Sequence, residues 1–290
     1  MTAIVRALSS RLTWSLLLGY LVVFGPAAVV LLHRLHEATI TVLSLEERYA
    51  IHAMRIDTYQ LLAWGVGFYL LGRLFPIRRP NAFDIAGAII VCLVGCFSSA
   101  AGLAALSLFL FMTGPRDVRR LAAATVFAAL FTQQAIVPII YDLLIQKMTQ
   151  LDVVLVGTVV ELTIPGATWQ SDIISMPSGH AIQVVAGCCS FTNVSLAFLS
   201  WVALTKFERP EWHPLDLVVL VAAAGSQILL NTIRIYLMAM SPDMYLYWHM
   251  GPGSQIFAAI ASAAVVLISA FGARWVSLRA TNRPLTVSPA

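Results

Sequence analysis

Three residues that together could form a thiol-based site follow one another in the second half of the chain. Cys189 lies in a Gly/Cys/Ser patch, Arg234 near the end of an apolar segment, and His249 in the turn before the next one. The pattern of apolar segments places all three at a similar depth, in consecutive helices. A nearby arginine or histidine favours the thiolate, which is the nucleophilic form of cysteine. We therefore predict a reactive Cys189; the alternative is a cysteine that only packs in the core.

The arginine belongs to a polar stripe. Gln227, Asn231 and Arg234 are spaced i, i+4, i+7, which places them on one helix face. An ionisable side chain inside an apolar segment is costly, so this face must meet protein or water, and it indicates a functional site. The alternative for Arg234 is that it extends to the interface and anchors the helix end. Asn231 either holds the arginine or a substrate backbone, or only packs one helix on another.

The other cysteines have simpler interpretations. Cys92 and Cys96 are one helical turn apart in an apolar segment and are expected to pack as small hydrophobes. Cys188 precedes Cys189, and consecutive helical residues point about 100° apart, so only one of the pair can face the site. Cys188 is the alternative nucleophile. The six histidines are scattered and no Cys/His cluster has zinc spacing, so we expect no metal and no cofactor.

The composition sets the class of protein. Of the 290 residues, 59% are hydrophobic and only 11% are charged, and the mean hydropathy is +0.84. Soluble domains carry about a quarter charged residues. Several apolar segments approach the roughly 20 residues that cross a bilayer as a helix. The net charge of +4 comes from short arginine clusters between apolar segments, which is typical of membrane topology, so we expect a membrane-embedded, lipid-contacting protein and no nucleic-acid partner.

We predict an all-α polytopic membrane protein with about eight transmembrane helices in a single domain, 1–290. The region 84–112 is too long for one helix, and we divide it near 98–102. The first segment is too long for a signal-peptide core and is expected to be a retained helix. The eight spans are at about 12–32, 59–75, two within 84–112, 122–144, 182–205, 215–238 and 253–271.

The basic residues give the orientation. With a cytoplasmic N-terminus, thirteen of the 18 Lys and Arg residues fall inside and five outside, as the positive-inside rule predicts. A seven-span arrangement places Arg116, Arg119 and Arg120 outside. The inside set is Arg6, Arg11, Arg73, Arg78, Arg79, Arg116, Arg119, Arg120, Lys206, Arg209, Arg274, Arg279 and Arg283, and the outside set is Arg34, Arg48, Arg55, Lys147 and Arg234.

Two long segments then lie on the extracytoplasmic side, at about 33–57 and 146–181. The second contains the β-branched runs 153–156 and 159–160, which favour a short extended lid or re-entrant segment before the sixth helix.

A competing motif lies at the end of this segment. Pro177-Ser178-Gly179-His180 matches the middle signature of the phosphatidic-acid-phosphatase type 2 superfamily, which binds phosphate. The flanking motifs fail, because Gly72 replaces the upstream lysine and Gly253 replaces the downstream aspartate. A lipid-phosphate phosphatase is therefore the alternative function. We interpret Pro177–His180 as a turn capping the sixth helix, with Ser178 as N-cap and His180 able to line the site entrance.

A third possibility is a small-solute transporter whose polar stripe lines a pathway for an anion. It requires matching polar features in the first half, where Gln133, Gln134 and Asp142 are the main candidates and no repeat is visible.

The ordered motifs resemble those of the exosortase/archaeosortase family. They are Ala186-Gly187-Cys188-Cys189-Ser190, then Asn231-x-x-Arg234, then His249-x3-Gly253-x3-Phe257. Members are polytopic membrane enzymes thought to act as cysteine transpeptidases on C-terminal sorting signals. The resemblance covers about 130–275, the expected catalytic region; the first half is similar in hydropathy only. Phe191 replaces the glycine that commonly follows Cys-Ser in the family.

The resemblance implies a mechanism and partners. Cys189 is the nucleophile, His249 the general base and acid, and Arg234 the oxyanion stabiliser. The expected substrates are exported proteins whose C-terminal signal has a transmembrane helix and a basic tail. The expected location is the cytoplasmic (inner) membrane of a cell, with the site on the extracytoplasmic side. The supporting or substrate-binding residues are Asn231, Gln227, Ser190 and His180.

Overall fold

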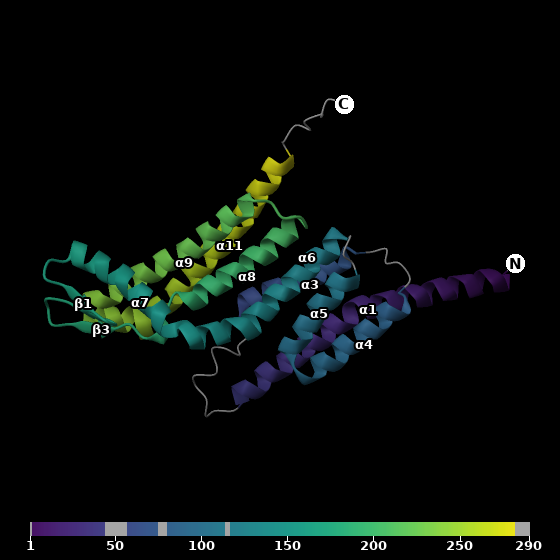
Figure 1. Cartoon of the computed structure of the whole chain (residues 1–290), viewed down its shortest axis with the longest axis horizontal. Helices are drawn as coiled ribbons and strands as arrows, with labels where there is room; N and C mark the ends of the chain where they lie inside the picture. Colours follow the sequence, from purple (N-terminus) through teal and green to yellow (C-terminus); the bar gives the residue numbers. More distant parts are fainter. Residues whose placement is uncertain (1, 44–56, 75–79, 114–116, 282–290) are drawn as a thin grey trace. The chain divides into compact units, whose positions relative to one another are not determined.

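The computed structural model describes residues 2–43, 57–74, 80–113 and 117–281. Helices make up most of these residues, and one small sheet lies beside them (Figure 1). The chain divides into two compact units. The first unit holds 1–136 and 202–212, and the second holds 137–201 and 213–290. Whether these units act as the single predicted domain stays a prediction.

The first unit consists of apolar helices with polar caps. Asp57 accepts a hydrogen bond from the N–H of Gln60 at 2.7 Å at the start of one helix, and Asn81 forms a capping box with Asp84 at the start of the next. The helices are α1 (Thr2–Leu43), α3 (Thr58–Gly72), α4 (Ala82–Phe97), α5 (Ser99–Thr113) and α6 (Val118–Phe131), which runs on into a π turn, η1 (Thr132–Ile136).

The predicted division of 84–112 is confirmed. Ser98 has extended backbone angles between α4 and α5, so the chain forms two helices there. Of the predicted outer segment 33–57, the part up to Leu43 continues α1, and 44–56 lies outside the described residues.

A polar network ties the α4–α5 break to two other helices. Glu37 of α1 forms ion pairs with His33 at 3.2 Å and with the buried Arg34 at 3.7 Å. The hydroxyl of Ser99 donates to Glu37 at 2.5 Å, and the Gln134 amide of η1 donates to Ser99. Gln134 therefore takes part in helix packing, which gives no support to a transport pathway through it.

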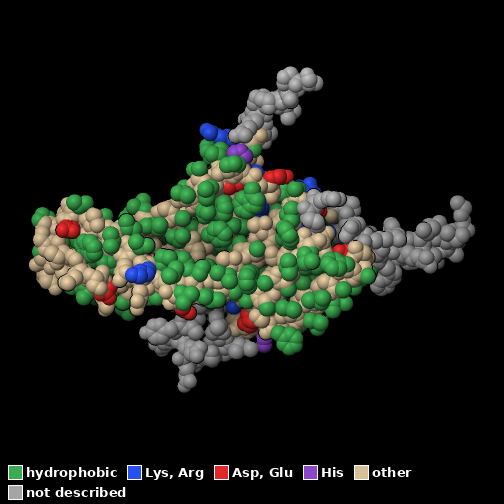
Figure 2. Space-filling view, viewed as in Figure 1, with side chains coloured by type: hydrophobic (Ala, Val, Ile, Leu, Met, Phe, Trp, Pro, Cys, Tyr) green, Lys and Arg blue, Asp and Glu red, His purple; other side chains and the backbone are tan. Residues whose placement is uncertain are grey.

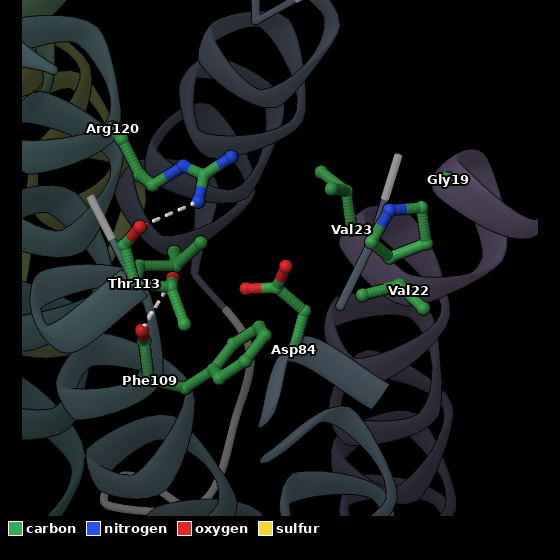
Figure 3. A pocket seen from close by; sticks show the side chains of 9 residues that line it. Gly19, Val22, Val23, Asp84, Phe109, Thr113 and Arg120 are labelled. Atoms are coloured by element: carbon green, nitrogen blue, oxygen red, sulfur yellow. Dashed lines mark hydrogen bonds between the residues drawn. The ribbon is translucent and has the colours of Figure 1, made fainter. Parts of the chain in front are cut away.

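A small cavity lies among α1, α4, α5 and α6 (Figure 3). Its volume is about 20 Å³, close to the space of one water molecule. Asp84 and Arg120 face it from different helices, and Arg120 donates to the carbonyl of Thr113 at 3.1 Å. The cavity is too small for any ligand larger than water.

The second unit combines long helices with a three-stranded antiparallel sheet of order β1-β2-β3. Ile174 pairs with Trp169 on one side and with Ile182 on the other. β1 and β2 contact α7, and β3 contacts α9. The elements are α7 (Val137–Thr163), β1 (Thr168–Gln170), β2 (Ile173–Ser175), β3 (Ala181–Gln183), the 3₁₀ turn η2 (Ala186–Cys188), α8 (Phe191–Glu208), α9 (Leu215–Met240), α10 (Pro242–Tyr245), the π turn η3 (Leu246–Met250) and α11 (Pro252–Thr281). The part of α8 up to Trp201 belongs to this unit, and the rest belongs to the first.

The prediction of an extended segment from 146 was wrong for its first half. Residues up to Thr163 continue α7, and the extended chain begins only at β1. The buried positions of α7 include Asp152, Val153, Val156 and Val160, which recur at the helical period. The three valines share a buried cluster with Ile174 and Ile182 of the sheet. Burial on one face therefore overrides the β-branched composition, because strand propensity is weaker than tertiary packing.

The interpretation of Pro177–His180 as a helix cap was also wrong. These residues form the turn between β2 and β3, in which the N–H of Met176 donates to the carbonyl of His180 at 2.8 Å. Gly179 has φ +86, a conformation that glycine adopts without strain. The helix predicted from 182 begins at Phe191, because β3 and η2 take up the residues before it.

The lengths of the helices fit a multi-pass membrane protein. Among the residues that the structure describes, five helical segments are long and apolar enough to cross a bilayer, and α4 and α5 are shorter apolar helices. Hydrophobic side chains cover most of the face in Figure 2, where charged side chains are sparse. The count of eight spans stays a prediction. The five segments are Leu17–Thr39, Val118–Thr163, Ala186–Glu208, Leu215–Met240 and Pro252–Ala280.

The contact between α7 and β1 gives a stability prediction. A Cβ added at Gly157 overlaps the ring of Trp169 at its base, whereas a Cβ at Gly225 of α9 meets nothing within 4 Å. Both changes gain up to about 1 kcal/mol of helix propensity. Gly157→Ala should still lower the thermal unfolding midpoint in detergent, because overpacking costs about 1–3 kcal/mol, and Gly225→Ala should not. Equal midpoints for the two variants would contradict this packing.

Candidate active site

The chain leaves regular helix at the cysteine pair. The 3₁₀ turn Ala186–Cys188 ends at Cys189, which has extended angles (φ −70, ψ 135), and α8 starts two residues later. Cys188 and Cys189 therefore do not lie inside a helix, which corrects the prediction. Because the backbone changes direction between them, the two buried thiols have different surroundings.

Side chains from two helices hold the backbone of this segment. The Asn231 amide of α9 donates to the carbonyl of Cys188 at 2.7 Å. The Tyr141 hydroxyl of α7 donates to the carbonyl of Ala186 at 3.0 Å. Backbone groups that lack regular partners are costly in apolar surroundings, so these bonds stabilise the departure from helix. The predicted supporting residue Asn231 therefore lies at the site and holds the cysteine backbone.

Asp152 of α7 holds the next residue. Its carboxylate accepts the Ser190 N–H at 2.8 Å and the Ser190 hydroxyl at 2.7 Å. Asp152 is only 2% exposed. The predicted supporting residue Ser190 is thus fixed by a buried acid, immediately before the first turn of α8.

The Cys189 thiol faces α7. Its polar neighbours are the Asp152 carboxylate, the Thr149 hydroxyl and the N–H of Phe191 at the start of α8. A helix N-terminus favours a thiolate, and a neighbouring carboxylate opposes it. Sequence reasoning missed Asp152 and Thr149 because it placed them in an extended segment. Their spacing of three, together with that of the buried valines after them, is the helical signal that could have found them.

The Cys188 thiol lies on the other side. It belongs to a buried cluster that includes Ile235 and Met238 of α9. The positive charge of Arg234 acts on this thiol. Of the two cysteine thiols, that of Cys188 is therefore the one on which the charge of Arg234 acts in this structure.

Arg234 joins α9 to the turn that carries His249. Its Nε donates to the carbonyl of Trp248 at 3.2 Å. Its guanidinium carbon lies 5.8 Å from the centre of the Phe257 ring on α11, within range of a cation–π contact. These contacts fix the arginine beside the turn that carries His249.

His249 lies in the π turn η3, a distortion that is frequent at functional sites. Its ring packs against Tyr245 at 4.9 Å between centres. Its Nδ1 is buried and has no hydrogen-bond partner among the described residues. Burial lowers the pKa of His249 below its ordinary value, and the charge of Arg234 lowers this pKa further. The ring is therefore neutral at physiological pH and can accept a proton.

The two remaining predicted residues, Gln227 and His180, contact other parts of the second unit. The Gln227 amide donates to the carbonyl of Ala261 on α11 at 3.1 Å, so it packs two helices together. His180 Nε2 lies 3.2 Å from the carbonyl oxygen of Met238, and its ring meets the edge of Tyr245. Tyr245 therefore touches both His180 and His249 and connects the β2–β3 turn to the site.

Phe191 packs at the position where the resemblance led us to expect glycine. Its ring stacks on Tyr141 at 6.3 Å, and Tyr141 in turn bonds the carbonyl of Ala186. The larger side chain thus supports the same segment that carries the cysteines. The departure from the family pattern is accommodated within this site.

The second unit therefore contains a fixed arginine, a histidine whose pKa is lowered and a buried thiol pair. In the part of the chain that the structure describes, no group of three His, Cys, Asp or Glu side chains could hold a metal ion.

The comparisons with known proteins agree with the resemblance. The family model described as transmembrane exosortase matches residues 13–266. This match includes the first half of the chain, for which only hydropathy was similar. No curated protein and no solved structure matches the chain.

The electrostatics of His249 give a titration prediction. Arg234→Gln should raise the pKa of His249, because the neighbouring positive charge that disfavours its protonation is removed. The rise should stop short of about 6.5, the ordinary histidine value, because burial is the larger cause. NMR of histidine-labelled protein in detergent measures this, with His249→Gln assigning the signal. An unchanged or lower pKa in Arg234→Gln would contradict the placement of the arginine.

Proposed function

The chain belongs to the transmembrane exosortase family, and we propose that it is a cysteine transpeptidase or protease acting on exported proteins. The observation that carries the proposal is the fixed Cys188–Cys189 segment in the same unit as the Arg234–His249 pair. In this proposal Cys189 is the nucleophile, because its position before Ser190 matches the cysteine of the family motif.

The chemistry proceeds through a thioester. His249 takes the proton of the Cys189 thiol, and the thiolate sulfur attacks the carbonyl carbon of the scissile peptide bond. The electron pair of the C=O bond moves to its oxygen, and Arg234 donates hydrogen bonds to this oxyanion. When the C=O bond re-forms, the C–N bond breaks, and His249 gives its proton to the leaving amine. An amine or a water molecule then attacks the thioester and releases the thiol.

The surroundings of the Cys189 thiol place a condition on this series of reaction steps. Asp152 and Thr149 are its polar neighbours in the structure, and the arginine acts on the adjacent cysteine. The thiol must therefore turn from α7 towards His249 when substrate arrives.

The substrate and the location follow from the family and the charges. We propose that the substrate carries a C-terminal signal with a transmembrane helix and a basic tail. The thirteen-to-five distribution of Lys and Arg supports a cytoplasmic-membrane protein with eight spans and its site on the extracytoplasmic side.

The cysteine pair provides the sharpest test. Cys189→Ala should abolish processing of a co-expressed sorting-signal substrate, because the thiolate nucleophile is lost. Cys188→Ala, the matched control one residue away, should retain processing. Immunoblotting of substrate size measures both, and membrane-fraction protein levels show that the variants fold.

The reverse result, with Cys188→Ala inactive and Cys189→Ala active, would assign the nucleophile to Cys188. Normal processing by both variants would contradict a mechanism that uses a cysteine nucleophile.

Arg234 should contribute mainly to the transition state. Arg234→Gln is expected to slow processing about 100- to 1000-fold, as the loss of an oxyanion donor does. Arg234→Lys keeps the charge but loses the paired donors, so it should recover only part of the rate. Single-turnover cleavage of a reconstituted substrate measures the chemical step. A change in substrate affinity alone, at an unchanged cleavage rate, would assign the arginine to binding instead.

A further inference from the structure

Asp152 is the buried acid closest to the proposed chemistry, and the mechanism above does not use it. It lies on α7, at 2% exposure, in a helix that sequence reasoning took for an extended segment. Both of its oxygens accept hydrogen bonds from Ser190. A carboxylate buried at this depth is tolerated only when such bonds replace its water.

The position of Ser190 gives these bonds their effect. Ser190 precedes Phe191, the first residue of α8, so its N–H lies at the end of the helix where N–H groups have no helical partner. A carboxylate from another helix satisfies this end and is favoured by the helix dipole. The two bonds therefore fix the start of α8 and, through the peptide bond, the position of Cys189.

The charge of Asp152 has a second effect, on the thiol itself. The carboxylate is a polar neighbour of Cys189, and a negative charge nearby disfavours the thiolate. The other titratable groups around the cysteine pair are Tyr141 on α7, which is uncharged at neutral pH, and Arg234 on α9, which acts on Cys188. His249 faces the arginine from η3. Asp152 is therefore the group whose negative charge bears on the Cys189 thiol.

We propose that Asp152 is a positioning residue that anchors the Cys189–Ser190 junction and keeps the Cys189 thiol protonated until it turns towards His249. This role rests on the proposed function, in which Cys189 is the nucleophile. It gives the site a resting state in which burial and the charge of Asp152 together hold a neutral thiol. The thiol becomes reactive only on the side where Arg234 and His249 lie.

Three variants separate position from charge. Asp152→Asn keeps an oxygen for the Ser190 N–H and an amide for its hydroxyl, so it preserves the anchor and removes the charge. Asp152→Ala removes both. Asp142→Asn is the matched control, because Asp142 is an exposed acid on the same helix.

The first readout is the alkylation rate of Cys189 by iodoacetamide as a function of pH. It uses full-length protein with Cys92→Ser, Cys96→Ser and Cys188→Ala, which leaves Cys189 as the one cysteine of the chain. Asp152→Asn should raise the rate at pH 7 about tenfold and move the pH profile to lower pH. Asp142→Asn should leave the profile unchanged. A profile unchanged by Asp152→Asn would overturn the charge role.

The second readout is processing of the sorting-signal substrate. Asp152→Asn should process within about threefold of the parent protein, whereas Asp152→Ala should lose at least about tenfold, because an unpaired N–H is left at the start of α8. Equal processing by Asp152→Ala and the parent would overturn the positioning role. If Asp152→Ala fails to accumulate, Asp152→Asn and the alkylation profile still decide the question.

The two proposals fail in different ways. If Cys189→Ala still processes substrate, the proposed function is wrong, but the alkylation profile still tests the effect of Asp152 on the thiol. If Cys189→Ala is inactive and Asp152→Asn changes neither readout, the proposed function stands and the role of Asp152 is rejected.

Discussion

The site depends on one constraint: a backbone that leaves helix among apolar side chains must find other hydrogen-bond partners. From Ala186 to Ser190 the chain has no continuous ladder of its own. Asn231, Tyr141 and Asp152 supply the partners. An unsatisfied buried backbone group costs about 1–3 kcal/mol, so the three side chains together decide whether this segment exists in its observed form.

The departure of this segment from helix also explains where the two thiols lie. In a continuous helix the two cysteines would be separated only by the helical rotation between neighbours. The turn instead directs Cys188 into the core beside α9 and Cys189 towards α7. Two adjacent residues of the same type therefore have different electrostatic surroundings: the charge of Asp152 acts on both thiols, and the charge of Arg234 acts on that of Cys188. The choice between the two cysteines as nucleophile therefore depends on where the backbone directs each thiol, as well as on the sequence motif.

Aromatic side chains connect this segment to the rest of the second unit. Phe191 and Tyr141 support the cysteine segment from one side. Tyr245 contacts both His180 and His249, which links the β2–β3 turn to the proposed base. The last residue of the Pro177–His180 turn thus lies one side chain away from His249.

The sequence by itself determined the class of protein and the break between α4 and α5, and it predicted that Arg234 and His249 belong to one site. These follow from hydropathy, from a Ser-Gly interruption and from helical spacing, which are local properties of the chain. Only the tertiary structure revealed the helical course of α7 and the approach of Asp152 to Ser190. Val153 and Val156 are equally compatible with strand or helix until their burial is known, and a contact across 38 residues leaves no local pattern.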